Sequence, residues 1–122
     1  MPDLILIERI LTIEFSEIIE ATEIIHNKLR IFLKEESFVD IWFSSRIKGR
    51  YSHHWDRRKI DNTFYRHDNM PHKKWETVKT FPKHFHNGSS KDKDVKESFL
   101  NDEPVTSVRE FFKFIKERIK TP

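Results

Sequence analysis

Apolar residues recur with a period of two over most of the first half of the chain, and this pattern restricts the possible folds more than any other feature. Leu29, Ile31 and Leu33, for example, alternate with side chains that are mostly basic. Such alternation predicts strands with one buried face. Because the turns between the runs are short, we expect neighbouring strands to be antiparallel. The predicted strands cover 18–25, 28–34, 38–43, 47–55 and 63–67.

Both ends of the chain have helical periodicity instead, which predicts helices over 3–14 and 106–119. Ser107 and Glu110 have the spacing of a capping box for the second helix. We interpret its apolar stripe as core packing, and we predict one α+β domain over 1–122. In that domain an antiparallel sheet of about five strands packs with an N-terminal and a C-terminal helix. The helical stripes are Leu4, Ile7, Leu11 and Phe15, then Val108, Phe111, Phe112, Ile115 and Ile119.

The stretch 69–90 is predicted to be irregular. Pro71 and Pro82 disfavour regular strands there, and the Asn-Gly-Ser-Ser run at 87–90 is typical of a loop. The charged segment 91–97 is expected to be a mobile loop.

Composition excludes several classes of site. The chain has no cysteine, so disulfides, thiolate metal sites and a cysteine nucleophile are excluded. Its two glycines, Gly49 and Gly88, lie too far apart to form a phosphate-cradling loop, which disfavours nucleotide cofactors. The apolar run 4–7 ends at Glu8 and is too short for a signal peptide or a membrane span. We therefore expect a cytoplasmic protein with no membrane partner.

Charge is distributed unevenly along the chain. Residues 1–45 contain four Lys or Arg against nine Asp or Glu, whereas residues 46–96 contain fourteen against six. A basic middle segment suits a polyanion such as nucleic acid. A solvated, lysine-rich loop would give the same count, so both interpretations stay open.

Six of the seven histidines fall between residues 53 and 86. Histidine changes charge near neutral pH and is the commonest metal ligand. In an extended segment alternate residues share a face, so His84 and His86 are expected to point the same way. His53 and His54 must point to opposite faces, and His53 is interpreted as packing. No histidine is followed by glutamate, which excludes a His-Glu-x-x-His metalloprotease helix.

Three sequence blocks between residues 51 and 86 resemble a known family. The blocks are Tyr51-Ser52-His53-His54-Trp55-Asp56, Tyr65-Arg66-His67-Asp68-Asn69-Met70-Pro71-His72 and Thr80-Phe81-Pro82-Lys83-His84-Phe85-His86. Their order and spacing are similar to those of TumE-type toxins of prokaryotic toxin–antitoxin systems. The resemblance implies a toxin encoded beside a DNA-binding antitoxin. The positions that match the family pattern are Tyr51, His54, Trp55, Arg66, Asp68, Asn69, Pro71, His72, Pro82, His84 and His86.

The leading functional hypothesis is a ribonuclease that works without a metal or other cofactor. RNA cleavage needs a base for the 2′-OH, an acid for the leaving oxygen and a cation beside the phosphate. We predict His72 and His84 as the acid/base pair and Asp68 as the group that orients one imidazole. Arg66 and His54 are the predicted phosphate donors, and Tyr51 or Trp55 could stack on a base. The predicted RNA-binding residues are Arg50, Tyr51, Arg57, Arg58, Lys59, Lys73, Lys74 and His86.

Two alternatives remain open at this stage. The first is a metal-dependent nuclease or phosphodiesterase, with His72, His84, His86 and Asp68 as ligands that activate a water molecule. The shortage of carboxylates in 53–86 counts against it. The second is a non-catalytic module that binds nucleic acid or a protein. The expected partners are a cognate antitoxin protein and RNA, and the oligomeric state, a homo-oligomer included, stays open.

Overall fold

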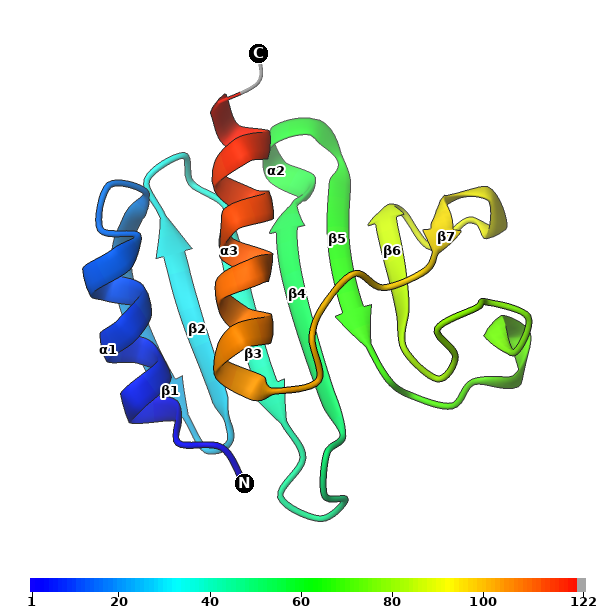
Figure 1. The fold of residues 1–122 in the computed structure, drawn as a ribbon. Helices are drawn as coiled ribbons and strands as arrows, with labels where there is room; N and C mark the ends of the chain where they lie inside the picture. The colour runs from blue at the N-terminus through cyan, green and yellow to red at the C-terminus, as the bar shows by residue number, and fades with distance from the viewer. Residues whose placement is uncertain (121–122) are drawn as a thin grey trace.

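The computed structural model describes residues 1–120, so the last two residues of the predicted domain lie outside the described part. Its sheet has seven strands within these residues, and each is hydrogen-bonded to the next along the chain (Figure 1). All six pairings are antiparallel, as predicted, although about five strands were expected. The elements are α1 (Leu4–Glu14), β1 (Ile19–Ile25), β2 (Lys28–Leu33), β3 (Phe38–Phe43), β4 (Tyr51–Arg57), α2 (Arg58–Asp61), β5 (Thr63–Asp68), η1 (Lys73–Trp75), β6 (His84–Gly88), η2 (Asp92–Asp94), β7 (Val95–Lys96) and α3 (Pro104–Lys120).

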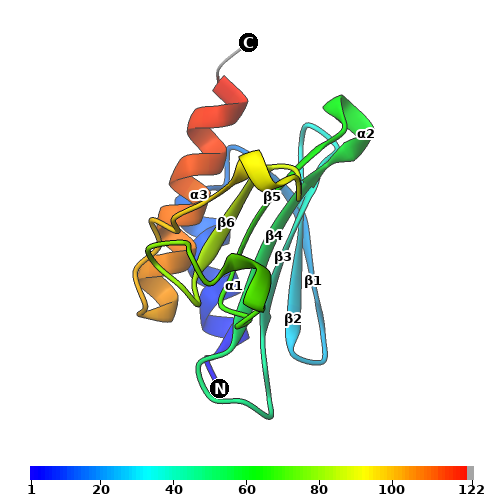
Figure 2. The ribbon, with the colours of Figure 1, turned by 90° about the vertical axis from the view of Figure 1, so that its right-hand side faces the viewer.

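Helices α1 and α3 lie side by side and cover the same face of the sheet, which leaves the opposite face without a helix (Figures 1 and 2). Their contact includes the rings of Phe15 and Phe112, with centroids 5.5 Å apart, and an ion pair between Glu14 and Arg109. Alternate residues of each strand point toward the helices. The core therefore lies between the helix pair and β2–β5, around Trp55, Phe111 and their buried neighbours.

Several of the hairpins and turns use left-handed backbone. His26 has a φ of 56° in the two-residue turn between β1 and β2, and Asn62 has a φ of 63° where α2 ends. Gly49 has a φ of 83° in the loop before β4, a conformation that other residues seldom adopt. These turns fix the strand register, and the register decides which side chains meet across the sheet.

The predicted strand 47–55 is wrong at its start, because β4 begins at Tyr51. The Oγ atom of Ser44 accepts hydrogen bonds from the backbone N–H groups of Arg46 and Ile47, which curls the chain into a loop after β3. Serine side chains compete with sheet pairing for backbone donors in this way.

The region predicted to be irregular contains one strand, β6, and the segment expected to be a mobile loop contains η2 and β7. Pro82 precedes β6 by two residues, so its missing N–H does not interrupt the pairing with β5. The prediction that prolines exclude regular strands was correct for residues 69–83, whereas residues 84–88 form β6.

Helix α3 begins two residues before the predicted start and is capped differently. The Glu103 carboxylate accepts hydrogen bonds from the backbone N–H groups of Val105 and Thr106, at 2.9 Å each. Glu110, the second member of the predicted capping box, instead accepts a bond from the backbone N–H of Asn101. Among residues 1–120, no helix is both long and apolar enough to cross a membrane.

Candidate active site

Two rows of polar and aromatic side chains cross the uncovered face of the sheet. In the first row the strand register pairs Asp40 with His54, His54 with Arg66, and Arg66 with His86. In the second row it pairs Trp42 with Ser52, Ser52 with Asp68, and Asp68 with His84. Paired residues on one face of a sheet lie about 5 Å apart. The meander therefore gathers side chains from four consecutive strands.

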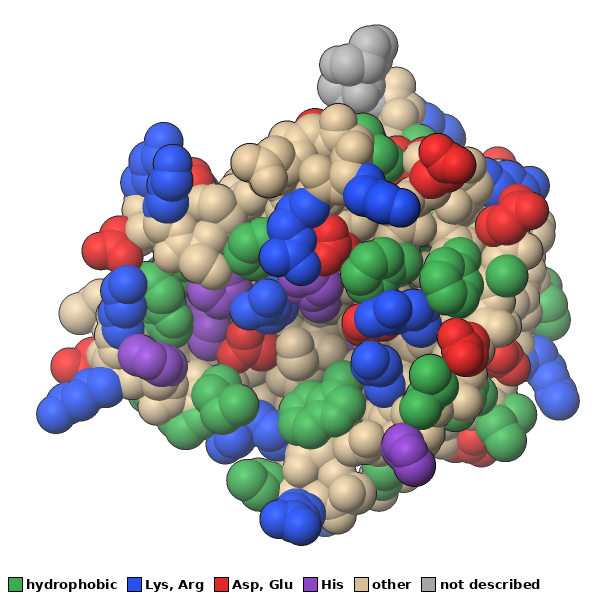
Figure 3. Space-filling view, turned by 180° about the vertical axis from the view of Figure 1, so that it is seen from behind, with side chains coloured by type: hydrophobic (Ala, Val, Ile, Leu, Met, Phe, Trp, Pro, Cys, Tyr) green, Lys and Arg blue, Asp and Glu red, His purple; other side chains and the backbone are tan. Residues whose placement is uncertain are grey.

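A pocket of about 450 Å³ opens on this face between the sheet and the loop that carries η1. Ser52 has a small side chain, and its position between the larger Trp42 and Asp68 leaves room for the hollow. Figure 3 shows histidine side chains beside a carboxylate there, with lysine and arginine side chains around them. The lining residues include Trp42, Ser52, Arg66, Asp68, His72, Lys74, Trp75, His84 and His86.

Asp68 and His84 form the best-anchored pair in the pocket. The Nε2 atom of His84 lies 3.2 Å from Oδ1 of Asp68, and its Nδ1 lies 3.0 Å from the carbonyl oxygen of Pro82. A carbonyl oxygen accepts only, so Nδ1 carries a proton and Nε2 faces the carboxylate. Burial opposes the charged form of His84, but the hydrogen bonds to Asp68 and Pro82 raise its pKa.

Asp68 is ionised in this environment. Burial disfavours its charge, yet the hydrogen bond from His84 and the one from the backbone N–H of Met70 hold the pKa of Asp68 below its usual value. The side chain is thereby fixed with both oxygens turned toward β6.

His86 lies beside His84 with a different environment. Its Nε2 is 3.9 Å from Oδ2 of Asp68, and the two imidazole centroids are 4.9 Å apart. Burial and the neighbouring charge of His84 lower the pKa of His86 to about 4, so this imidazole is neutral near pH 7. Its Nδ1 atom is buried and has no hydrogen-bond partner among the described residues.

Arg66 brings a half-buried positive charge to the site. Its Nε donates a hydrogen bond of 3.1 Å to Nδ1 of His54, whose Nε2 lies 3.3 Å from Oδ2 of Asp56. His54 therefore carries its proton on Nε2, and burial together with the Arg66 charge lowers its pKa. Within residues 1–120, no acceptor is found for the two terminal NH₂ groups of Arg66. His54 is not among the residues that line the pocket, but it holds Arg66, which is.

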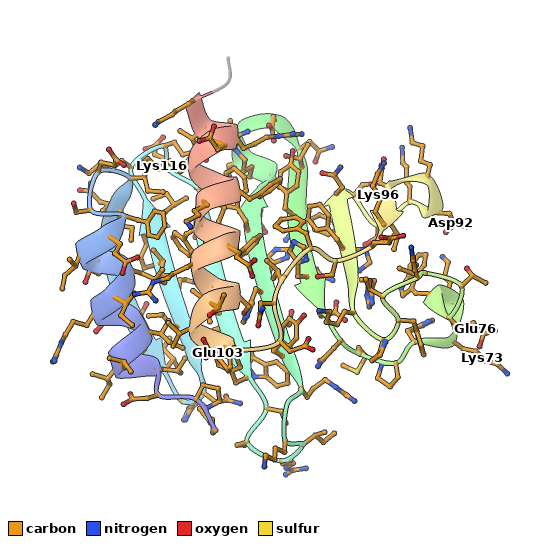
Figure 4. The ribbon with its side chains drawn as sticks, viewed as in Figure 1. Lys73, Glu76, Asp92, Lys96, Glu103 and Lys116 are labelled. Carbon is orange, nitrogen blue, oxygen red and sulfur yellow. The ribbon has the colours of Figure 1, made fainter. Side chains whose placement is uncertain are left out.

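The loop between β5 and β6 forms the outer wall of the pocket. The Trp75 ring lies 6.0 Å from the His84 ring and 5.7 Å from the His86 ring. His72 is exposed, and its Nδ1 accepts a hydrogen bond from the backbone N–H of Lys74. The Lys74 ammonium pairs with Asp92 at 3.2 Å, which joins this loop to the loop after β6. Figure 4 shows Lys73 and Glu76 at the far end of the wall, away from the strands.

The pocket brings together Arg66, Asp68, His72, His84, His86 and Lys74 from the predicted set. Arg57, Arg58 and Lys59 lie instead at the opposite end of β4. Arg57 is paired with Glu35 and Asp61, and Arg58 is paired with Asp56. Arg50 donates to the Met70 sulfur beside the pocket, and Lys73 is exposed.

Of the two aromatic residues expected to stack on a base, Trp55 is fully buried at a helix-facing position of β4 and is not among the residues that line the pocket. Tyr51, another member of the predicted set, does line the pocket, but its side chain is nearly buried and its ring centroid lies 4.8 Å from that of His53. Trp42 and Trp75 line the pocket and were not selected from the sequence. The alternation around Ile41 places Trp42 on the uncovered face, but no local signal placed the η1 loop over it.

His53 and His67 lie on the helix-covered face and are fully buried. The register pairs them directly across β4 and β5. The interpretation of His53 as a packing residue is consistent with its contacts, since its ring lies 5.2 Å from that of Phe43. His53 and His67 therefore do not belong to the candidate site.

One group of side chains has the composition and spacing of a metal-binding set. Asp68, His84 and His86 each offer one donor atom, and these atoms all lie within 4.8 Å of one another. His72 belonged to the predicted ligand set but is not a member of this group.

The chain matches one family model among known proteins. The family model for Toxin TumE matches residues 5–119, which include every strand and residue of the pocket described above. Neither the comparison with curated proteins nor the one with solved structures finds a match. The match covers nearly the whole chain and agrees with the resemblance of the three blocks between 51 and 86, and the chain therefore belongs to the TumE toxin family.

Proposed function

We propose that this toxin-family chain is a ribonuclease that cleaves RNA in the pocket on the uncovered face. The observation that carries the proposal is the Arg66 guanidinium, which is half-buried beside Asp68, His84 and His86 without a carboxylate partner among the described residues. A desolvated cation with free donors favours a bound anion, and a planar guanidinium matches the oxygens of a phosphate. The phosphodiester would then lie directly over the two imidazoles.

Nucleobases have a suitable platform in the same pocket. Trp42 and Trp75 present aromatic surface on two sides of it, and Lys74 adds a charge at the rim. Single-stranded RNA is commonly bound through bases stacked on aromatic rings and through cations along the backbone. A double helix could not insert a stacked base between these walls, so we expect a single-stranded substrate.

The first candidate chemistry uses the histidines directly, as predicted from the sequence. A neutral His86 would take the proton from the 2′-OH, and the 2′ oxygen would form a bond to phosphorus. The bond from phosphorus to the 5′ oxygen would break, and His84 would protonate that oxygen. The products would be a cyclic phosphate and a 5′-OH. His86 replaces the predicted His72 as base here, because His72 lies at the exposed rim.

The second candidate chemistry uses a metal held by Asp68, His84 and His86, and the convergence of their donor atoms within 4.8 Å favours it. A bound metal would lower the pKa of a water molecule and deliver it to the phosphate. Arg66 would bind the phosphate in either case.

The proposal is tested by incubating the purified chain with a mixed single-stranded RNA pool, before and after exhaustive chelation, and analysing the product ends. Cyclic phosphate ends after chelation support the first chemistry. Activity that is lost on chelation and restored by metal, with 5′-phosphate ends, supports the second. A folded protein that cleaves no RNA under either condition would contradict the proposed function.

A further inference from the structure

We propose that Asp68, His84 and His86 bind a divalent transition-metal ion, zinc in the first instance, at the floor of the pocket. The inference deepens the proposed function, on which its catalytic meaning rests. Two imidazoles and one carboxylate are a known donor set for zinc with an open coordination position. Imidazole donors favour zinc and its transition-metal neighbours over calcium or magnesium, which prefer oxygen ligands.

The separations of the donor atoms fit one ion. Two ligands of a tetrahedral zinc ion, each about 2.1 Å from the metal, are roughly 3.4 Å apart. Nε2 of His84 lies 3.2 Å from Oδ1 of Asp68, and Nε2 of His86 lies 3.9 Å from Oδ2. One donor atom from each of the three residues lies within 4.8 Å of the other two, so a small adjustment of the side chains would bring all three to one ion.

The surroundings of His84 match those of a metal ligand. Its Nδ1 donates to the Pro82 carbonyl at 3.0 Å, which fixes the ring with Nε2 toward Asp68. Histidines that bind metals usually donate their other N–H to a carbonyl or carboxylate in this way.

Burial makes the arrangement more informative than a surface cluster. His84 is 2% exposed, His86 is 4% exposed and Asp68 is 9% exposed, although all three are polar. Polar groups are seldom buried together without full pairing, and Nε2 of His86 lies 3.9 Å from Oδ2 of Asp68, which is too far for a hydrogen bond. A metal ion would use the Nε2 atoms of both imidazoles and would balance the buried carboxylate.

The site also has an open side. The pocket of about 450 Å³ lies over these three residues, with Arg66 on its wall. A zinc ion would add two positive charges to the one on Arg66, against the single negative charge of Asp68. The floor would then attract a phosphate strongly, and the open position would hold a water molecule or a phosphate oxygen.

The shortage of carboxylates in 53–86 disfavours magnesium-type sites, which are built from oxygen ligands. It does not disfavour zinc, for which two imidazoles and a single carboxylate are sufficient. The meander supplies this set by placing Asp68 opposite His84 on β5 and β6.

The test measures metal content and affinity in the untagged chain, without RNA. The wild-type chain is stripped with a chelator, loaded with zinc, dialysed and analysed for bound metal per chain. Thermal unfolding with and without zinc gives a second readout. We expect one zinc ion per chain and a higher melting temperature with zinc. Magnesium at the same concentration should neither stay bound to the chain nor raise its melting temperature.

Three variants locate the site. His86→Gln and Asp68→Asn remove one donor each with little change of volume, and each should weaken zinc binding at least tenfold. His26→Asn is the matched control, because it removes an exposed imidazole from the β1–β2 turn and asparagine tolerates the positive φ. It should bind zinc like the wild type. Circular dichroism without metal confirms that each variant is folded.

Two results would overturn the site: a wild-type chain that binds no zinc, or equal affinity in the wild type, His86→Gln and Asp68→Asn. Failure of the proposed function looks different. A chain that binds zinc through these residues but cleaves no RNA would retain the metal site and contradict the ribonuclease. Cleavage that survives complete chelation would support the ribonuclease and contradict a catalytic role for the metal.

Discussion

The two faces of the sheet use the same kind of residue in opposite ways. On the helix-covered face His53 and His67 are enclosed by aromatic rings and sit opposite each other on β4 and β5. On the uncovered face His84 and His86 surround a carboxylate at the floor of a pocket. The side chain is the same, and its position in the alternation of the strand decides whether it packs in the core or lines the pocket. A histidine-rich segment is therefore informative only after each residue has been assigned to a face.

The largest difference between the faces should be in stability. Phe111 is a fully buried residue of α3, whereas Phe32 is 37% exposed on the uncovered face. Phe111→Ala should lower the free energy of unfolding by about 3–5 kcal/mol, because it leaves a cavity in the core. Phe32→Ala should cost less than about 1 kcal/mol. Urea denaturation measures both, and equal losses would contradict the division of the sheet into a core face and an open face.

The next prediction compares the RNA cleavage of two kinds of variant: one that loses Arg66, which lines the pocket, and one that loses basic residues at the far end of β4. Arg66→Ala should reduce RNA cleavage about 10²- to 10³-fold, the usual cost of losing a donor to the developing negative charge. The double variant Arg58→Gln/Lys59→Gln removes two charges at the far end of β4 and should retain cleavage within a few-fold. If the double variant loses as much activity as Arg66→Ala, the RNA does not bind where we propose.

Acid should destabilise the chain through the covered face. Burial lowers the pKa of His53 from 6.5 to about 4, so its neutral form stabilises the fold. That stability is fully present above pH 6.5 and is lost as the pH falls toward 4, at up to about 1.4 kcal/mol per pH unit, because the unfolded chain binds one more proton.

His53→Leu removes the titrating group. The free energy of unfolding should then fall less steeply with decreasing pH, by up to about 1.4 kcal/mol per pH unit. Urea denaturation between pH 4 and 7 measures the difference. An identical acid limb in the wild type and His53→Leu would mean that His53 is not neutral in the folded state.

The smallest effect is expected for the aromatic walls of the pocket. Trp75→Ala and Trp42→Ala should each weaken the binding of a single-stranded, 2′-O-methylated RNA by about 1–3 kcal/mol, the range for loss of one stacked base. Fluorescence anisotropy with a labelled oligonucleotide measures the change. Phe32→Ala, which removes an aromatic ring from the same face outside the pocket, should bind like the wild type.

The sequence predicts the architecture better than it predicts the site. The helical period and the period of two predict the bounds of both long helices and of four strands to within a few residues. They do so because burial of one face imposes each period directly on the sequence. β6 was missed because its alternating pattern covers only five residues and follows a proline. Its register against β5 is nevertheless what brings His84 to Asp68.

Among the site residues, the same-face placement of His84 and His86 could be deduced from their spacing alone. The link between Arg66 and His54 could not, because it depends on a cross-strand pairing between residues twelve positions apart. Trp75 was missed for a related reason. It reaches the pocket through the path of a 15-residue connection between β5 and β6, which carries no periodic pattern.

The neighbour-to-neighbour order of the strands has a consequence for how the protein is made. Each hairpin closes with residues already synthesised, and local pairings of this kind form quickly compared with distant ones. The N-terminal strands can therefore assemble on the ribosome, but the pocket needs β6, and the core needs α3, which ends the described chain. A growing chain would therefore lack the pocket until β6 has been made, and its core would stay open on the helix side until α3 has followed.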